Sequence, residues 1–162
     1  MATTTTHNYG SEQQWLATLS IDSIPANLTL STLTTGSQIV FDKFSGGDVT
    51  ATVNKHRPGG MGPELTYMSL PSYSDVVLTK VYETQVDHDK VADLHLLVGR
   101  GLVSVTLQAL DDEGNPWTSS QAGAGARVYQ GRLTAVKDGG TDSMSNAARM
   151  YEIDIAVETV TN

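Results

Sequence analysis

The sequence contains no cysteine and only 10 Lys and Arg residues among 162. Without cysteine the chain forms neither disulfide bonds nor zinc sites with thiolate ligands, and it is compatible with a reducing cytosol. Its 18 Asp and Glu residues give a formal net charge of -8. Tight nonspecific binding of duplex DNA needs a concentrated basic surface, so we expect the chain to tolerate nucleic acid without binding it.

Long apolar runs are also missing. No stretch approaches the roughly 18 apolar residues of a membrane helix. The first ten residues are polar and lack the basic and then apolar layout of a signal peptide. We therefore expect a soluble protein made in the cytoplasm, with no membrane partner. Charged residues are only 17% of the chain and aromatic residues 6%, whereas Thr, Ser and Gly are abundant, which favours strands and turns.

The residue patterns of common enzyme sites are absent too. The serine nucleophile elbow, G-x-S-x-G, does not occur, and Gly123 and Gly125 lack the third glycine and following helix of a dinucleotide site. His88 and His95 lie seven residues apart, which is not the i, i+4 spacing of zinc-binding helices. We expect no enzyme activity, no catalytic residue, no metal and no cofactor.

What the sequence does contain is a series of short strand patterns. About seven strands are predicted, in residues 15–22, 28–41, 49–54, 75–84, 102–110, 126–136 and 151–160. Gly46 and Gly47 predict a hairpin turn that returns through residues 49–54. We expect residues 1–12 to be a flexible segment and residues 13–162 to form a single domain. Its fold class is mainly β, a β-sandwich or partly open barrel with one packed α-helix.

The one helical pattern follows the fourth of these strands. Its apolar side chains recur at helical spacing at Val91, Leu94, Leu97 and Val98. Asp87 or Asp89 is placed to cap the start of the helix, and Gly99 is placed to end it. We expect the apolar face to pack on the sheet of the same subunit.

The last predicted strand separates apolar from acidic side chains. Its apolar positions are Tyr151, Ile153, Ile155 and Val157. Glu152, Asp154 and Glu158 alternate with them and therefore lie on the opposite face. Periodicity predicts that one face is core and the other acidic, but it leaves open whether the acidic face lines a cavity or the exterior.

Residues 55–74 carry three prolines and three glycines, which interrupt any continuous strand. A long connection of this kind is usually functional or disordered. Its large apolar side chains indicate that it docks on another surface, so we expect it to order on assembly and to bridge subunits or rings. An internally packed Ω-loop is the alternative. The expected contact residues are Lys55, Arg57, Met61, Glu64, Tyr67, Met68 and Tyr73.

Residues 55–80 resemble a segment of bacteriophage tail tube proteins. In both, a basic glycine-containing loop and a short polar stretch lead into a strand of the type D-V-x-L-T-[KR], here Asp75 to Lys80. One helix and then strands to the C-terminus follow, an order similar to the tube fold shared by phage tails and the secreted ring protein of type VI secretion. The resemblance covers residues 40–160.

This resemblance implies a structural subunit that closes into hexameric rings, which stack into a hollow virion tail tube conducting DNA. It also implies assembly in the cytoplasm of the host bacterium. The implied partners are further copies of the chain, the tape measure, tail terminator and baseplate or tip proteins, and a sheath if the tail is contractile. DNA would pass without specific binding. Glu152, Asp154 and Glu158 are then candidates for a bore that repels phosphates.

Two other interpretations stay open. A secretion or contractile injection machine would use the same fold for its tube, with a different cargo. A β-sandwich binding module of a virion would use exposed aromatic side chains, for which Tyr67, Tyr73 and Trp117 are candidates.

Overall fold

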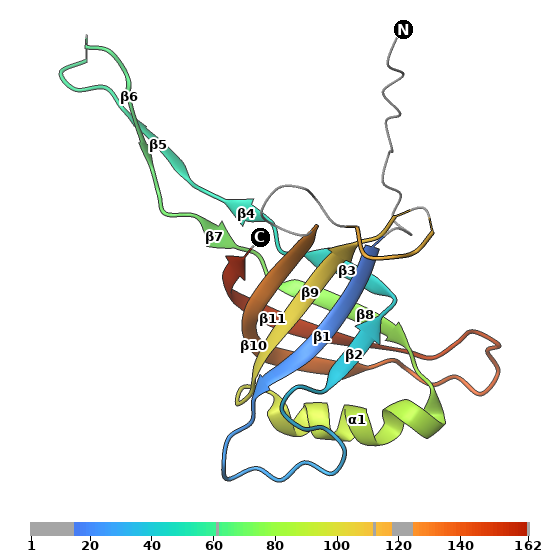
Figure 1. The fold of residues 1–162 in the computed structure, drawn as a ribbon. Helices are drawn as coiled ribbons and strands as arrows, with labels where there is room; N and C mark the ends of the chain where they lie inside the picture. Colours follow the sequence, from blue (N-terminus) through green and yellow to red (C-terminus); the bar gives the residue numbers. More distant parts are fainter. Residues whose placement is uncertain (1–14, 61, 112, 118–124, 162) are drawn as a thin grey trace, which may run out of the picture.

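The structure is a computed structural model that describes residues 15–60, 62–111, 113–117 and 125–161. The expected flexible segment, residues 1–12, and the contact residue Met61 lie outside these ranges. The main strands are β1 (Trp15–Ser23), β2 (Gln38–Phe41), β3 (Lys43–Gly46), β8 (Val76–Val81), β9 (Leu102–Ala109), β10 (Ala126–Asp138) and β11 (Met150–Thr161). They form one seven-stranded sheet in the order β2-β1-β9-β10-β11-β8-β3, which curls around the core (Figure 1). The expected fold class is confirmed.

The two outermost strands of this sheet are joined by a single residue. β2 ends at Phe41 and β3 begins at Lys43, so the chain passes from one edge of the sheet to the other at Asp42. The backbone N–H of Asp42 donates to the carbonyl oxygen of Thr79 over 3.1 Å. Its carboxylate accepts a hydrogen bond from the N–H of Val81 at 2.9 Å. The sheet is therefore a half-barrel whose edges are held together by one kinked strand.

The hydrophobic core lies inside the curl of the sheet. On β11, Tyr151, Ile153 and Ile155 are buried, which confirms the alternation predicted for this strand. Alternate residues in the middle of β1, Ala17, Leu19 and Ile21, are also buried. The ring of Tyr151 contacts two aromatic side chains in edge-on geometry, Phe41 of β2 and Tyr82 between β8 and α1.

Helix α1 (Thr84–Leu97) packs across one end of the curled sheet (Figure 1). Leu94 and Leu97 are fully buried and belong to the same hydrophobic cluster as the strands. The expectation that the apolar face packs on the subunit's own sheet is therefore confirmed. Val91 is also buried, and Val98, just beyond the helix, is partly buried against the cluster.

The predicted start of the helix is wrong. Glu83 stands at the N-cap position without a side-chain capping bond, and neither Asp87 nor Asp89 occupies it. Asp87 is instead fully buried, where it pairs with Nζ of Lys80 at 2.7 Å and accepts from the N–H of Glu83 at 3.0 Å. Lys80 lies on β8, so a tertiary contact draws this aspartate inward.

The hairpin predicted at Gly46 and Gly47 does not form. β3 pairs with β8 instead, and the chain then leaves the sheet. Both glycines have positive φ, 88° and 74°, a region that other residues rarely adopt. A Cβ on Gly46 would collide with the carbonyl oxygen of Asp75, and one on Gly47 would lie 2.6 Å from the ring of Tyr129. The two glycines therefore allow the backbone to turn sharply out of the sheet after β3. The local sequence of such a turn is the same as that of a hairpin turn.

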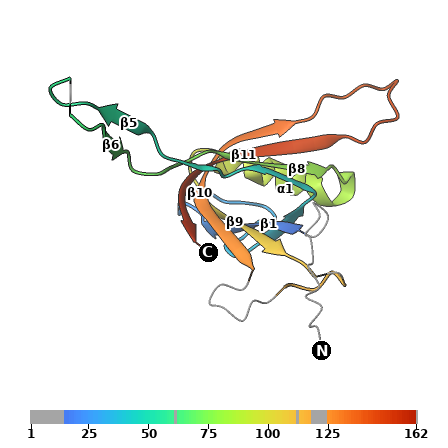
Figure 2. The ribbon, with the colours of Figure 1, turned by 90° about the horizontal axis from the view of Figure 1, so that it is seen from above.

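Residues 49–73 form an arm that projects from the sheet (Figures 1 and 2). At its base β4 (Val49–Thr50) pairs with β7 (Ser72–Tyr73), and further out β5 (Val53–His56) pairs with β6 (Leu65–Met68). The expectation of an interrupted loop is therefore wrong for this segment. Its prolines and glycines fall between the strands and not within them. We call the β5–β6 pair the ribbon.

Residues 24–37 connect β1 to β2 without regular strands, so the strand pattern predicted over residues 28–41 is realised only in β2. The buried carboxylate of Asp93 on α1 organises this connection. It accepts hydrogen bonds from the N–H groups of Ser31, Thr32 and Leu33 at 3.0, 2.7 and 2.8 Å, and from the Ser31 hydroxyl at 3.0 Å. Because these N–H groups point at a side chain, they are not free to join a strand ladder.

The hydrogen bonds around Asp93 also set its ionisation. Burial raises the pKa of this carboxyl, but the N–H groups of Leu33, Ser31 and Thr32 together outweigh burial and hold the pKa below its ordinary 3.8. A group with a depressed folded pKa stabilises the fold above its unfolded pKa. That stabilisation is lost as the pH falls through the folded value.

We expect Asp93→Ala to lower the free energy of unfolding by about 3 kcal/mol at neutral pH, because buried N–H groups lose a charged acceptor. Urea unfolding measures the change, and Asp89→Ala on the exposed side of the same helix is the control. Between neutral pH and about pH 3, the wild type should lose more stability than Asp93→Ala. Equal losses would contradict this role of Asp93.

Candidate assembly surfaces

The histidines and acidic residues of the chain do not gather into a metal site. Within the described ranges, no group of three His, Asp or Glu side chains is placed to hold a metal ion. His88 contacts the hydroxyl of Tyr82 through Nδ1 at 3.0 Å, and His95 contacts the carboxylate of Asp138 at 3.2 Å. Both histidines thus have structural neighbours, and the absence of catalysis stays a prediction.

A membrane-spanning helix is not found either. Of the residues that the structure describes, none belongs to a helix with the length and apolar character needed to cross a bilayer.

The first candidate surface is the arm. All eight residues of the ribbon are exposed, including Tyr67 at 56% and Met68 at 70%. Leu70, between β6 and β7, is 88% exposed. A concentration of large apolar side chains in solvent marks a contact surface, and a two-stranded ribbon alone is only marginally stable in water.

The structure places every described member of the predicted contact set on this arm. Lys55 lies on β5, Tyr67 and Met68 lie on β6, Tyr73 lies on β7, and Arg57 and Glu64 lie between β5 and β6. Tyr73 is partly buried, whereas the others are exposed. Sequence reasoning missed Val53, Leu65 and Leu70, which are exposed apolar residues of the same arm. In sequence, such apolar residues look like those of a buried strand. Only the pairing of β5 with β6, away from the main sheet, shows that they lie outside the core.

The second surface is the outer face, the side of the seven-stranded sheet turned away from the core. Glu152, Asp154 and Glu158 project there from β11, and β10 supplies a cation to each. Lys137 Nζ lies 2.8 Å from a carboxylate oxygen of Glu152 and 2.6 Å from one of Asp154. Arg132 Nε lies 3.1 Å from Glu158. The predicted acidic set is therefore paired with positive charge.

Glu158 lies at a β-bulge in the pairing of β10 with β11. Gln130 of β10 lies opposite Thr159, whereas the next residue, Gly131, lies opposite Val157. Glu158 is therefore the extra residue of β11, and a bulge of this kind redirects a side chain locally.

The register extends the outer face over neighbouring strands. Lys43 of β3 lies opposite Thr79, which lies opposite Glu152, so the three side chains share a face. On the same face but nearer the β1 edge of the sheet, Asp22 accepts hydrogen bonds from Ser104 and Gln130. These contacts place on the outer face the carboxylates of Asp22, Glu152, Asp154 and Glu158 and the cations of Lys43, Arg132 and Lys137. Acidic charge on one strand is thus nearly balanced across the sheet.

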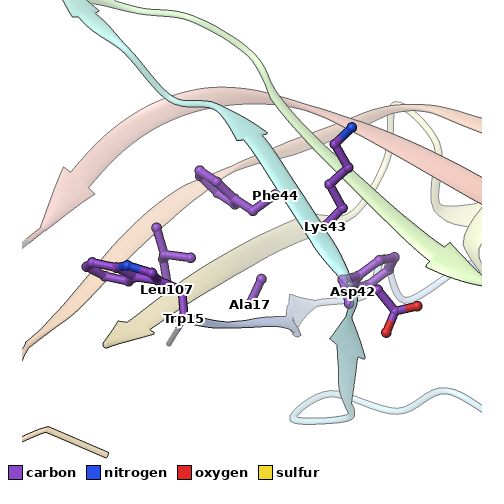
Figure 3. Close-up of a pocket in the computed structure, with 7 residues that line it drawn as sticks. Trp15, Ala17, Asp42, Lys43, Phe44 and Leu107 are labelled. Carbon is purple, nitrogen blue, oxygen red and sulfur yellow. The ribbon is translucent and has the colours of Figure 1, made fainter. Parts of the chain in front are cut away.

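The third surface is a pocket of about 340 Å³ where β1 and β3 diverge (Figure 3). β1 pairs with β2 only from Ala17 onward, and β3 pairs with β8, so the strands splay apart at the start of β1. The pocket is lined by Trp15, Ala17, Phe41, Asp42, Lys43, Phe44 and Leu107. Five of these seven residues are aromatic or aliphatic, and the other two, Asp42 and Lys43, are charged.

The aromatic residues expected of a binding module do not share one loop. Tyr67 and Tyr73 lie on the arm, whereas Trp117 follows the isolated bridge between Leu110 and Pro116, beyond β9. The structure thus gives no single aromatic platform from these three side chains.

Comparison with known proteins shows similarity in structure and not in sequence. No family model matches the chain, and no curated protein matches it significantly in sequence. A chain in the structure of the anti-feeding prophage (AFP) baseplate is 16% identical, with a TM-score of 0.67 and 96% of each chain covered. The sheath/tube terminator structure of an extracellular contractile injection system, PVC, contains a chain with 13% identity, a TM-score of 0.65, and coverage of 97% of this chain and 98% of that one.

A chain of the PVC sheath-tube complex is similar as well, with 14% identity, a TM-score of 0.60, and coverage of 94% and 90%. The chain has a tail-tube-like fold. This confirms the fold that the resemblance at residues 55–80 predicted. Because these three chains are only 13% to 16% identical to this one, the likeness establishes the tail-tube-like fold alone.

The ion pairs of the outer face lead to a testable expectation. Lys137 donates to Asp154 and Glu152, and these bonds raise its pKa. We expect Lys137→Ala to lower the thermal midpoint of unfolding, because Glu152 and Asp154 then repel each other without a cation between them. Added salt should reduce the loss, since exposed charges are screened. Lys55→Ala on the ribbon is the control. If the thermal midpoint of Lys137→Ala fell by the same amount at low and high salt, the ion pairs of Lys137 would not be the cause.

Proposed function

We propose that this chain is a structural subunit of a tube and works by assembling with copies of itself, without catalysis. The observation that carries the proposal is the arm, whose ribbon exposes apolar side chains on a tail-tube-like fold. A ribbon of two strands needs another surface to become stable. Head-to-tail contacts that close by rotation generate rings, and the resemblance to tail tubes implies six subunits per ring and stacking of rings into a tube.

The solved structures of similar fold support the same role. They come from a baseplate, a sheath/tube terminator and a sheath-tube complex. A subunit of such a machine would meet, besides its own copies, a terminator at one end, baseplate proteins at the other, and a tape measure protein inside. A contractile machine would add a sheath around the tube.

Two cargoes fit this proposal. The resemblance at residues 55–80 implies a bacteriophage tail in which the tube conducts DNA. The similar solved structures include an extracellular contractile injection system, which favours the second candidate, an injection machine with another cargo. In both cases the architecture of the tube is the same, and the net charge of -8 disfavours retention of DNA on the tube.

We assign the outer face to the bore of the tube. Its charges are largely neutralised in place, because Lys137 and Arg132 are already engaged by Glu152, Asp154 and Glu158. Cations that are already paired attract phosphates less than free ones. A wall of this kind lets a charged cargo slide, since neither sign of charge finds a strong partner.

Assembly through the arm is tested by shortening it. We expect wild-type protein to form rings or tubes in negative-stain images, and a variant with residues 52–70 replaced by a short Gly-Ser turn to stay a folded monomer. Hydrogen exchange should show β5 and β6 protected in the tube but not in the subunit, because only assembly covers them. Tubes formed by the shortened chain would contradict the role of the arm. Wild-type protein that remained monomeric at all concentrations would contradict the proposed function.

Placement of the outer face is tested by labelling. The chain has no cysteine, so Glu158→Cys introduces a unique thiol. We expect a maleimide attached to a bulky polymer to react with this thiol in the isolated subunit but not in the tube, while a small maleimide enters the bore and reacts in both. Asp89→Cys, on the exposed side of α1, measures access to another surface. Equal reaction of the bulky reagent in subunit and tube would place this face on the exterior.

A further inference from the structure

The hairpin of β10 and β11 extends beyond the sheet and lies beside helix α1 (Figures 1 and 2). A small pocket of about 170 Å³ lies between the helix and this hairpin. The titratable residues of its lining are Tyr82, His88, His95, Asp138 and Arg149. Arginine is positively charged and histidine becomes so on protonation, so three of these five side chains are suited to an anion.

Arg149 is held at the pocket by a contact that leaves its charge available. The Cζ atom of its guanidinium lies 4.7 Å from the centroid of the Tyr82 ring, a cation–π contact. The N–H of Tyr82 donates to the carbonyl oxygen of Arg149 at 2.8 Å, which fixes the backbone at the same place. In the part of the chain that the structure describes, no carboxylate pairs with this guanidinium. Its N–H groups are therefore available to the oxygens of a ligand.

Tyr82 also orients an imidazole at the same pocket. Its hydroxyl lies 3.0 Å from Nδ1 of His88, so Nε2 is the ring nitrogen of His88 that remains for a ligand. When the hydroxyl donates to Nδ1, the neutral imidazole carries its proton on Nε2 and donates from there. The pocket then has two kinds of donor, the guanidinium of Arg149 and the Nε2–H of His88.

The acidic member of the lining, Asp138, already has a partner. Its carboxylate lies 3.2 Å from Nε2 of His95. Both side chains are exposed, so the pair contributes little to stability, but it sets a positive charge beside the carboxylate whenever the imidazole is protonated. Repulsion between Asp138 and an incoming anion is weakest in that state.

We infer that this pocket binds a phosphate group, with Arg149 and His88 as the donors. Two N–H groups of a guanidinium fork and one imidazole N–H make three donors, which match the three terminal oxygens of a phosphate group. A carboxylate offers only two oxygens to the same donors. None of these residues belongs to the ribbon or to the ion pairs of the outer face, so the inference does not depend on the proposed tube.

Inorganic phosphate tests the site in an NMR titration of the full-length chain labelled at histidine. We expect a saturable shift of the His88 resonances, with a dissociation constant of about 1 mM. Sodium chloride at the same ionic strength should give no saturable shift. Arg149→Gln should weaken binding about tenfold or more, whereas Arg57→Gln on the arm is the matched control and should not. Because Arg149 is exposed, the urea midpoint of Arg149→Gln should equal that of the wild type.

Two further measurements test the role of His88. Tyr82→Phe keeps the ring beside Arg149 but removes the hydroxyl that orients His88, so phosphate should bind more weakly to this folded variant. Sulfate keeps its charge between about pH 8 and pH 5, whereas imidazoles gain a proton over that range, so sulfate should bind more tightly at the lower pH. Equal phosphate affinity in Arg149→Gln and wild type, or a shift that chloride reproduces, would overturn the site. Sulfate affinity that is independent of pH would overturn the assignment of His88 as a donor.

Discussion

The strand that runs through β2 and β3 pairs with two different neighbours, and the rest of the fold depends on this double pairing. Its first half hydrogen-bonds to β1 and its second half to β8, with Asp42 at the kink. A seven-stranded sheet would otherwise end in two open edges, which invite uncontrolled strand addition. Joining them curls the sheet around its core and sets the direction in which the arm leaves at Gly46 and Gly47.

Buried carboxylates tie the remaining pieces to this half-barrel. Asp87 joins α1 to β8 through Lys80, and Asp93 joins α1 to the connection at Ser31–Leu33. Buried charges are costly unless a cation or hydrogen bonds compensate them. Asp87 is paired with Lys80, and Asp93 accepts four hydrogen bonds. Helix α1 therefore covers one end of the sheet. It also fixes the connection between β1 and β2, which forms no regular strand.

The finished subunit has surfaces of opposite character. The outer face balances its charges internally, as in the pairs that Lys137 makes with Glu152 and Asp154. The arm instead exposes apolar side chains that its own subunit leaves uncovered, with Leu70 at 88%. An outer face with paired charges and an arm with uncovered apolar side chains are both consistent with the proposed tube subunit.

Periodicity along the chain was enough to predict the mainly β class, the buried alternation of Tyr151, Ile153 and Ile155, and the apolar face of α1, because burial on one face of an element is a local pattern. It also located the arm, but as a loop. Pairing partners were decided by tertiary structure alone. The chain after Gly47 finds its partner across a turn of the arm, Asp93 reaches Ser31 over 62 residues, and the acidic strand meets Lys137 on a neighbouring strand. Such contacts depend on which distant segments fold side by side, and local sequence does not encode that choice.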